Sequence, residues 1–238
     1  MKFGINNPAF LQMAGQAGKA NSLFYITSNV DDNELTFENT KLGVWADNIQ
    51  YSTDGAKTWV QLTDDLALTL NEGETVYFRN YTGSAYNSAM STKVVNVADI
   101  YSIGGDITKL FYPGVKLPAY AFKDAFNGDT NLQIASELLL PATALAESCY
   151  SYMFNGCTSL TAAPALPATA LAEYCYSNMF NGCTSLTAVT CLATSNIDIA
   201  TEYWLSDVAA DGTFTKAAGV EWPEGASGIP EGWSVVEA

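Results

Sequence analysis

The stretches LPATALAESCYSYMFNGCTSLTAAPA (residues 140–165) and LPATALAEYCYSNMFNGCTSLTAVTC (residues 166–191) are near-copies of each other. The two 26-residue units differ at five positions and are therefore identical at 21. A degenerate earlier copy begins at Leu117 and aligns residues 126–128 with residues 154–156. Self-similarity at a fixed period of this length is the signature of a repeat architecture, in which stacked units share one continuous core.

Each unit is expected to contain a short strand and a short helix. The sequence Leu-Thr-Ala at 160–162 and 186–188 suits a strand, which the next Leu-Pro pair ends because proline cannot donate to a ladder. Residues 147–154 and 173–180 are expected to form two helical turns that place Cys, Met and Phe inward. The Asn-Gly that follows closes the helix, since glycine is the usual left-handed cap. Such a unit buries its apolar face only against another copy, with parallel strands about 4.8 Å apart.

The flanks of the repeats have a different character. Residues 23–98 contain short strand-like runs separated by turn residues such as Asp54-Gly55, which is typical of a small β-sandwich. The runs are 23–27, 35–37, 42–45, 59–62, 66–70 and 75–79. One mixed domain continuous with the repeats is the alternative. Residues 199–238, which contain three tryptophans, are expected to cover the last open edge of the repeats and to end in a strand at 233–236.

The repeat resembles a known family. It is similar to the BspA-type leucine-rich repeat in its succession of Leu160, Leu166, Pro167, Leu171, Phe180, Cys183 and Leu186. Segments 101–107, 212–216 and 228–233 also resemble proteins with this repeat, which are common in gut Bacteroides-group bacteria and their bacteriophages. The likeness covers roughly residues 45–238 and is most specific over 117–191. The first copy departs from the pattern at Asp129, where later copies have cysteine, as a terminal repeat is expected to do.

The resemblance and the flanking patterns together predict a multi-module α+β fold. Residues 1–22 are a tail or attachment segment, and 23–98 a small β-sandwich. Residues 99–194 are a leucine-rich-repeat-like solenoid of parallel strands and short helices, and 195–238 a C-terminal β cap. The uneven charge also indicates different modules, because the acids concentrate in the first half and the tail. Between residues 126 and 192 the charged residues are Asp129, Glu137, Glu147 and Glu173.

The composition disfavours several classes of partner. With 10 Lys and Arg against 25 Asp and Glu, the formal net charge is −15, which repels phosphate backbones and anionic lipid surfaces. We therefore expect no nucleic-acid and no membrane partner. The sequence contains no run of about 18 apolar residues, which is the length that could span a bilayer. Residues 1–8 lack the apolar stretch of a secretory signal, which indicates a mature protein or one that never used the general export route.

The sequence contains no histidine. This absence removes the commonest general base and the Ser/His and Cys/His nucleophile pairs, so we expect no enzymatic activity and no catalytic residue. Glu147 and Glu173 are repeat-equivalent, and stacked helices would place them about 10 Å apart. Glycosidases need carboxylates about 5 Å or about 6.5–9.5 Å apart. We expect each glutamate to complement the dipole of its helix in the first turn.

Neither a metal nor a cofactor is expected. The acidic run 31–34 offers oxygen ligands suited to calcium but lacks the spacing of a calcium loop, and a solvated turn is expected there. Residues 52–59 resemble the Asp-box of sialidase-type propellers, with Ala56 where that box prefers glycine. Asp54 is expected to cap its own backbone in a hairpin turn. The odd number of cysteines, without any C-x-x-C, predicts buried free thiols at Cys149, Cys157, Cys175, Cys183 and Cys191.

The candidate ligand-binding residues lie where the two repeats differ. Ser148 and Tyr152 of the first unit are replaced by Tyr174 and Asn178 in the second, around the shared Tyr150 and Tyr176. Stacked helices would present the tyrosines as an aromatic cluster suited to glycan stacking or protein contacts. The candidates are Tyr150, Tyr152, Tyr174, Tyr176 and Asn178. In the alternative interpretation, two of the four tyrosines tuck against the next helix and the others are ordinary surface.

The first 22 residues match neither neighbouring pattern. They are either a mobile tail or an attachment peptide that orders on a partner, with Phe3, Phe10, Leu11 and Met13 as its anchors.

The features above indicate a bacteriophage virion protein, such as a head or tail fibre, at the virion surface. Its N-terminal segment would dock on other virion proteins, and its repeats would bind a bacterial surface glycan or protein. A homotrimer is one arrangement for such a fibre, although no coiled-coil heptads support it. An exported adhesin at the bacterial cell surface is the alternative hypothesis, and a carbohydrate-active enzyme is the third.

Overall fold

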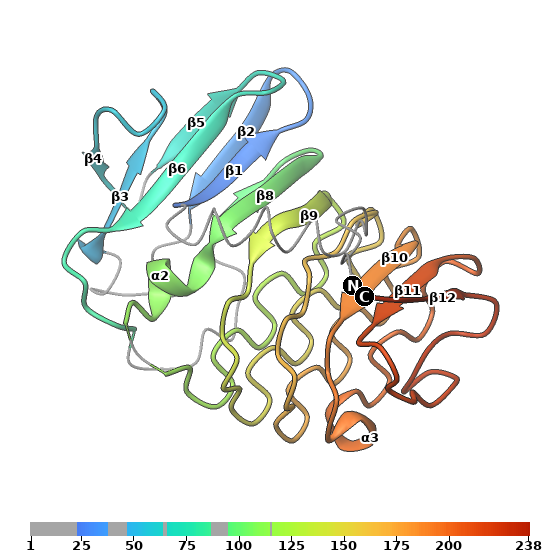
Figure 1. Cartoon of the computed structure of the whole chain (residues 1–238). Helices are drawn as coiled ribbons and strands as arrows, with labels where there is room; N and C mark the ends of the chain where they lie inside the picture. Colours follow the sequence, from blue (N-terminus) through green and yellow to red (C-terminus); the bar gives the residue numbers. More distant parts are fainter. Residues whose placement is uncertain (1–22, 38–46, 64–65, 87–94, 115) are drawn as a thin grey trace, which may run out of the picture.

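The computed structural model describes residues 23–37, 47–63, 66–86, 95–114 and 116–238. Strands and turns dominate, and this described part of the chain contains only two helices, α2 (Ile107–Phe111) and α3 (Ile197–Ala200). Neither of these helices is long and apolar enough to cross a membrane. Figure 1 shows two regions, with sheets toward the N-terminal half and a row of stacked coils toward the C-terminus.

Two β-sheets form the first region. Their strands are β1 (Phe24–Ser28), β2 (Asn33–Phe37), β3 (Ile49–Ser52), β4 (Val60–Gln61), β5 (Ala67–Leu70), β6 (Thr75–Asn80), β7 (Val95–Val97), β8 (Tyr101–Asp106) and β9 (Leu132–Leu139). The larger sheet has the order β4-β3-β6-β1-β8-β9, and the smaller one β5-β2-β7. Their apolar faces meet, with the ring of Phe37 in β2 lying 6.1 Å from that of Phe78 in β6. The expected strand at 42–45 lies outside the described residues.

The larger sheet continues into the coiled region. Strand β8 pairs antiparallel with β1 and parallel with β9. One continuous sheet therefore crosses the domain boundary that was expected between residues 98 and 99. Gly104 of β8 makes this junction possible, because a Cβ there would lie 2.2 Å from the ring of Tyr25 on β1. The side chain of Tyr25 therefore occupies the space that a Cβ at position 104 would need.

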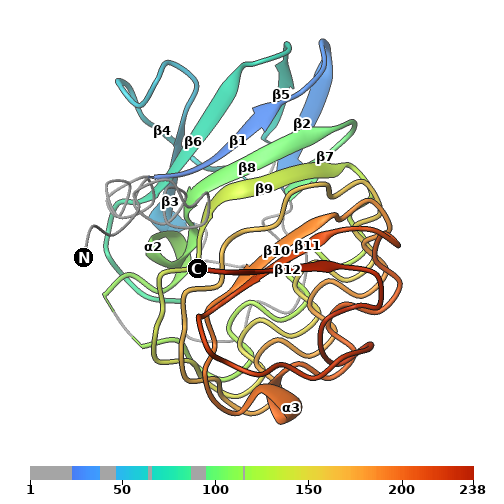
Figure 2. The same cartoon turned by 45° about the vertical axis from the view of Figure 1, so that its right-hand side comes forward.

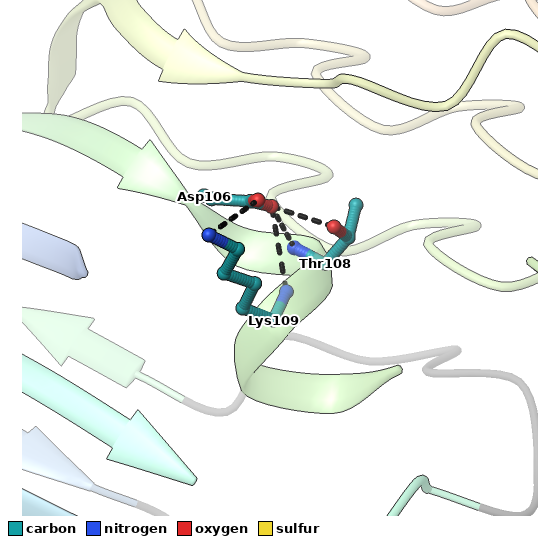
Figure 3. A network of polar contacts seen from close by, with 3 residues as sticks. All are labelled: Asp106, Thr108 and Lys109. Atoms are coloured by element: carbon teal, nitrogen blue, oxygen red, sulfur yellow. Dashed lines mark hydrogen bonds and ion pairs between the residues drawn. The ribbon is translucent and has the colours of Figure 1, made fainter. Parts of the chain in front are cut away.

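Asp106 ends β8 and begins α2 (Figure 3). Its Oδ1 accepts hydrogen bonds from the backbone N–H of Thr108 at 3.0 Å and of Lys109 at 3.4 Å, and from the Thr108 hydroxyl at 2.6 Å. The Lys109 ammonium lies 3.9 Å from Oδ2. Aspartate is a favoured N-cap because its carboxylate satisfies N–H groups that the first helical turn leaves unpaired. This short helix turns the chain from the sheet into the first coil.

On one side, successive coils are joined by parallel backbone pairing. After β8 and β9, single bridges join Ile134 to Ala162 and Leu166 to Cys191. The last coils form a three-stranded parallel sheet of β10 (Ala188–Cys191), β11 (Thr213–Lys216) and β12 (Ser234–Glu237). Figure 2 shows these strands side by side, with the rest of each coil looping away on the same side.

The other side of each coil is a ribbon of β-turns, where helices were expected. Within residues 146–157 the backbone N–H groups alternate between two partners. Those of Cys149, Ser151 and Met153 donate to the carbonyl three residues earlier, whereas those of the residues between them donate to the next coil. Every fourth residue has a positive φ: Ser148, Tyr152 and Gly156. An α-helix cannot continue through such a residue.

The predicted fold class is therefore wrong. The repeats do not alternate strands with short helices, and neither residues 147–154 nor residues 173–180 form a helix. The leucine-rich-repeat-like solenoid is replaced by coils built from short strands, isolated bridges and β-turns. Equivalent residues still stack. Gly156 and Gly182 each lie directly against the glycine of the preceding coil, because a Cβ at these positions would be only 3.6 and 3.5 Å from its Cα.

Aromatic rings stack along the interior of the coils. The rings of Phe126, Phe154 and Phe180 are parallel, with centroids 5.5 Å apart at both steps. A second column consists of Phe122, Tyr150, Tyr176, Trp204 and Trp222. All five cysteines are buried thiols outside any disulfide, as predicted. The indole N–H groups of Trp204 and Trp233 donate to the carbonyls of Gly228 and Ala209, which fastens the last residues onto the stack.

Candidate functional site

Two of the predicted ligand-binding residues belong to the interior. Tyr150 and Tyr176 are each 1% exposed, and their rings stack on each other at 6.1 Å. Burial raises the pKa of both hydroxyls well above the ordinary value, with neighbouring thiols adding to the effect. Neither ring has a face open to a ligand, so their assignment to a surface cluster is corrected. Each of them lies midway between two left-handed positions of its coil. The left-handed positions carry the side chains that face outward, so a side chain midway between them faces inward.

The other three candidates lie on the surface. Tyr174 is 37% exposed, and Tyr152 and Asn178 are half-buried. All three have a positive φ, at 54°, 56° and 53° respectively. The alternative interpretation, in which two of the four tyrosines are tucked inside, describes this arrangement.

The left-handed residues form columns that run along the stack. The first column contains Tyr120, Ser148 and Tyr174, and the second contains Asp124, Tyr152, Asn178 and Tyr203. The third contains Gly128, Gly156, Gly182 and Asp207. Within a column, the backbone N–H of one member donates to a carbonyl of the next coil. That carbonyl belongs to the residue directly before the next member of the column.

Each of the four successive coils therefore holds one tyrosine at a left-handed position on the surface, and these tyrosines alternate between two columns. The four residues, called here the tyrosine ridge, are Tyr120, Tyr152, Tyr174 and Tyr203. Tyr120 and Tyr203 are 41% and 54% exposed. Adjacent coils lie about 4.8 Å apart along such a ladder, so alternation keeps neighbouring rings from stacking on each other. Within their turn ribbons, the two repeats differ only in which of the two columns holds the tyrosine.

Tyr120 and Tyr203 were missed from the sequence. The signal that could have found them is the spacing of four residues between Tyr120, Asp124 and Gly128, which recurs at Tyr152 and Gly156. Asn, Asp and Gly are the residues that tolerate a left-handed backbone. Their presence at equivalent places marks the columns in which the tyrosines stand.

Acids and one lysine surround the tyrosine ridge. The hydroxyl of Tyr120 donates a 2.8 Å hydrogen bond to Oε1 of Glu147, and this bond raises the pKa of Tyr120. The ammonium of Lys123 lies 5.9 Å from the centroid of the Tyr120 ring and 5.7 Å from that of Tyr152. At these distances the cation is attracted to both ring faces. The contacts hold the first two ridge rings in place beside a carboxylate.

Glu147 and Glu173 are exposed on the outer surface of the turn ribbons. Each directly precedes a left-handed residue within a turn, so neither occupies the first turn of a helix, as had been expected. The carbonyl of Glu147 accepts the N–H of Tyr120, and that of Glu173 accepts the N–H of Ser148. The two glutamates thus sit beside the first column, where their carboxylates flank the ridge.

The acidic run 31–34 covers the end of the turn between β1 and β2 and the first two residues of β2. Asn33 is buried, and its side chain bonds the carbonyl of Ile100 and the N–H of Asp99. The carboxylate of Asp31 accepts the N–H of Glu72. Within the described residues no cluster of three or more His, Cys, Asp or Glu side chains could hold a metal ion. The side chains of Asp31 and Asn33 therefore hold neighbouring connections of the chain together.

The segment that resembles an Asp-box caps its own backbone. The carboxylate of Asp54 accepts hydrogen bonds from the N–H groups of Lys57 and Thr58 and from the hydroxyls of Ser52 and Thr58. These bonds hold the pKa of Asp54 well below its ordinary value. Ala56 takes a left-handed conformation, with φ 65°, at the place where the box prefers glycine. All these contacts are internal to the turn.

The attachment candidates Phe3, Phe10, Leu11 and Met13 lie outside the described residues. Scans against models of protein families, and searches of curated proteins and of solved structures, found no match to this chain.

Proposed function

We propose that this chain is a binding protein whose tyrosine ridge contacts a surface polysaccharide, without catalysing a reaction on it. The observation that carries the proposal is the conformation of the ridge: four tyrosines stand at left-handed positions, one per coil. A residue with a Cβ loses roughly 1–2 kcal/mol in that conformation. Backbone strain of this kind concentrates at functional positions.

The regular spacing favours a polymer as the ligand. The ridge repeats with the coils, about every 4.8 Å, which is close to the length of one pyranose unit. Tyrosine rings offer a rigid apolar face to the C–H groups of a sugar and a hydroxyl at the rim. The flanking carboxylates of Glu147 and Glu173 accept hydrogen bonds from sugar hydroxyls. A neutral polysaccharide also avoids the repulsion that a net charge of −15 imposes on anionic ligands.

The test replaces the ridge tyrosines by serine, the residue that the first column already holds at Ser148. The variant carries Tyr120→Ser, Tyr152→Ser, Tyr174→Ser and Tyr203→Ser. Its binding to immobilised capsular and cell-wall polysaccharides of Bacteroides-group bacteria is compared with that of the unmodified chain. Each stacked ring contributes about 0.5–1.5 kcal/mol, so we expect a loss of at least about tenfold.

The control is Thr187→Ala, an exposed position on the strand side of the coils, which we expect to bind as the unmodified chain does. Equal binding by the serine variant and the unmodified chain, with both folded by circular dichroism, would contradict the proposal.

The setting that we propose for this binding is a bacteriophage virion, in which the chain forms part of a fibre or other appendage. The resemblance of the repeat supports this setting, and an exported adhesin of the bacterial surface is the alternative. Mass spectrometry of purified particles and of the cell-surface fraction distinguishes the two. Recovery of the chain with capsid and tail proteins is expected, and recovery with the bacterial surface alone would overturn the setting.

A further inference from the structure

The C-terminal residues line two adjoining hollows at the end of the stack, both open to solvent and the second one shallow. One has a volume of about 330 Å³, and its lining includes Lys216, Glu221, Trp222, Glu224, Val235 and Trp233. The other has a volume of about 410 Å³, and its lining includes Tyr203, Leu205, Ser206, Asp207, Gly225 and Ala226. Pro230 and Glu231 line both hollows, so one loop separates them. Each lies at the lower end of the sizes of small-molecule sites.

The lining is aromatic and acidic. Glu221, Glu224 and Glu231 are exposed, whereas the ammonium of Lys216 is already bound to the Glu237 carboxylate and the Val220 carbonyl, both at 2.8 Å. The remaining charge is negative, which disfavours phosphate, sulfate and carboxylate ligands. Carboxylates beside indole rings are suited to a ligand with many hydroxyl groups, because they accept hydrogen bonds while the rings contact its apolar faces.

Two polar atoms near the hollows point to the same kind of ligand. The indole N–H of Trp222, a residue only 8% exposed, and the hydroxyl of Ser206 are buried without a hydrogen-bond partner among the described residues. Buried polar groups are nearly always paired in folded proteins. Trp222 lines the first hollow and Ser206 the second. Both atoms lie beneath the surface of the lining, so a hydroxyl-rich ligand reaches them when neighbouring side chains shift, and it then supplies the hydrogen bonds that they do not find among the described residues.

The tyrosine ridge leads into the second hollow. Tyr203 is the last residue of the ridge and also lines that hollow. We propose that the two hollows bind the terminal sugar units of the polysaccharide that lies along the ridge, with Glu231 contacting units on both sides of the loop. This inference rests on the proposed function but assigns a separate site, one that recognises the end of the chain and not its repeating middle.

The test uses short neutral probes, because a chain end is most abundant in oligosaccharides. Maltotetraose, xylotetraose, mannotetraose and chitotetraose are titrated by calorimetry into the full chain. We expect one of them to bind. Glu231→Gln should weaken it about tenfold, the effect of one charge-assisted hydrogen bond. Thr187→Ala, on the strand side of the coils, should leave it unchanged. Glu221→Gln and Glu224→Gln, which affect only the first hollow, give independent support if they weaken the same probe.

The failure of this inference differs from that of the proposed function. If none of the tetrasaccharides binds while the polysaccharide binds and Tyr152→Ser weakens it, the end site is overturned and the ridge is not. If a tetrasaccharide binds but the ridge variants leave polysaccharide binding unchanged, the ridge fails and the hollows alone bind sugar. Displacement of the saccharide by tetralysine, or binding of tetralysine alone, would overturn the inference in favour of a cationic ligand.

Discussion

A tyrosine with a positive φ is the residue-scale feature on which the proposed binding depends. The equivalent positions of the third column hold Gly128, Gly156 and Gly182, the residue type that this backbone accepts without strain. Tyrosine offers no local hydrogen bond to compensate, as Asn or Asp does. The ridge tyrosines therefore stay in place because the ladder to the next coil fixes their backbone, with the Tyr152 N–H donating to Ser177 at 2.9 Å.

Comparison of two truncations measures this strain. Tyr152→Gly and Tyr152→Ala both remove the ring, but only alanine keeps a Cβ at φ 56°. We expect the glycine variant to be more stable than the alanine variant by about 1 kcal/mol, because relief of the left-handed strain exceeds the added flexibility of the unfolded chain. Urea unfolding measures the difference. The same pair at Thr187, an exposed residue outside the positive-φ positions, should show the opposite order, and the same order at both positions would contradict the strain argument.

Sequence reasoning located the surface at Tyr152 and Tyr174 but misplaced Tyr150 and Tyr176. On a helix, the side chains of two residues that are two positions apart point in directions that differ by about 200°. All four rings could therefore gather at one surface only if several coils contributed to it. In the turn ribbon, by contrast, the outward position recurs every four residues. Which tyrosines face outward therefore depends on the sign of φ, and tyrosine itself gives no indication of a positive φ.

At the scale of elements, the turn ribbon imitates the sequence pattern of a helix. Its buried residues come in pairs four apart, Cys149 with Met153 and Tyr150 with Phe154, which is the i, i+4 spacing of an amphipathic helix. Glycine after the ribbon resembles a helix cap in the same way. The strands were predicted more accurately, since those expected at 23–27 and 75–79 overlap β1 and β6. The turn ribbon does not produce the period of two that marks a strand.

Asp129 shows how the first coil differs from the later ones. In those coils, Cys157 and Cys183 donate to the carbonyls of Phe126 and Phe154. Asp129, although buried, instead accepts the hydroxyl of Tyr101 and the N–H groups of Asn131 and Leu132. The carboxylate thus joins the turn ribbon to β8, the strand shared with the sandwich. The departure from the repeat pattern marks the place where two regions meet.

Restoring the repeat residue should therefore be harmful. We expect Asp129→Cys to destabilise the chain by about 1–3 kcal/mol, because the buried Tyr101 hydroxyl and the two N–H groups lose their acceptor. Urea unfolding of Asp129→Cys, Tyr101→Phe and the double variant forms a double-mutant cycle. The double variant should be less destabilised than the sum of the single ones. Additive effects would mean that the two side chains do not depend on each other.

At the scale of the whole molecule, the interior of the stack holds many groups that ionise only at high pH. Burial raises the pKa of Cys149, Cys183 and Cys191 from the ordinary 9.0 to about 12. Burial likewise raises the pKa of the Tyr101 hydroxyl far above its ordinary value of 10.0. These groups are neutral at pH 7 in both the folded and the unfolded chain, so they do not affect stability there. Their effect begins where the unfolded chain starts to lose protons that the folded chain keeps.

Stability should therefore fall steeply as the pH rises above 9. Because the unfolded chain ionises first, each thiol with a raised pKa removes about 1.4 kcal/mol of stability per pH unit between its unfolded and folded pKa values. Urea unfolding at pH 8 and pH 10 measures the loss. Cys183→Ala, although less stable at pH 8, should lose about 1.4 kcal/mol less over this interval. If that variant and the unmodified chain lose the same free energy, the thiol of Cys183 is not shielded from solvent, and the tight stacking of the coils around it is disproved at that point.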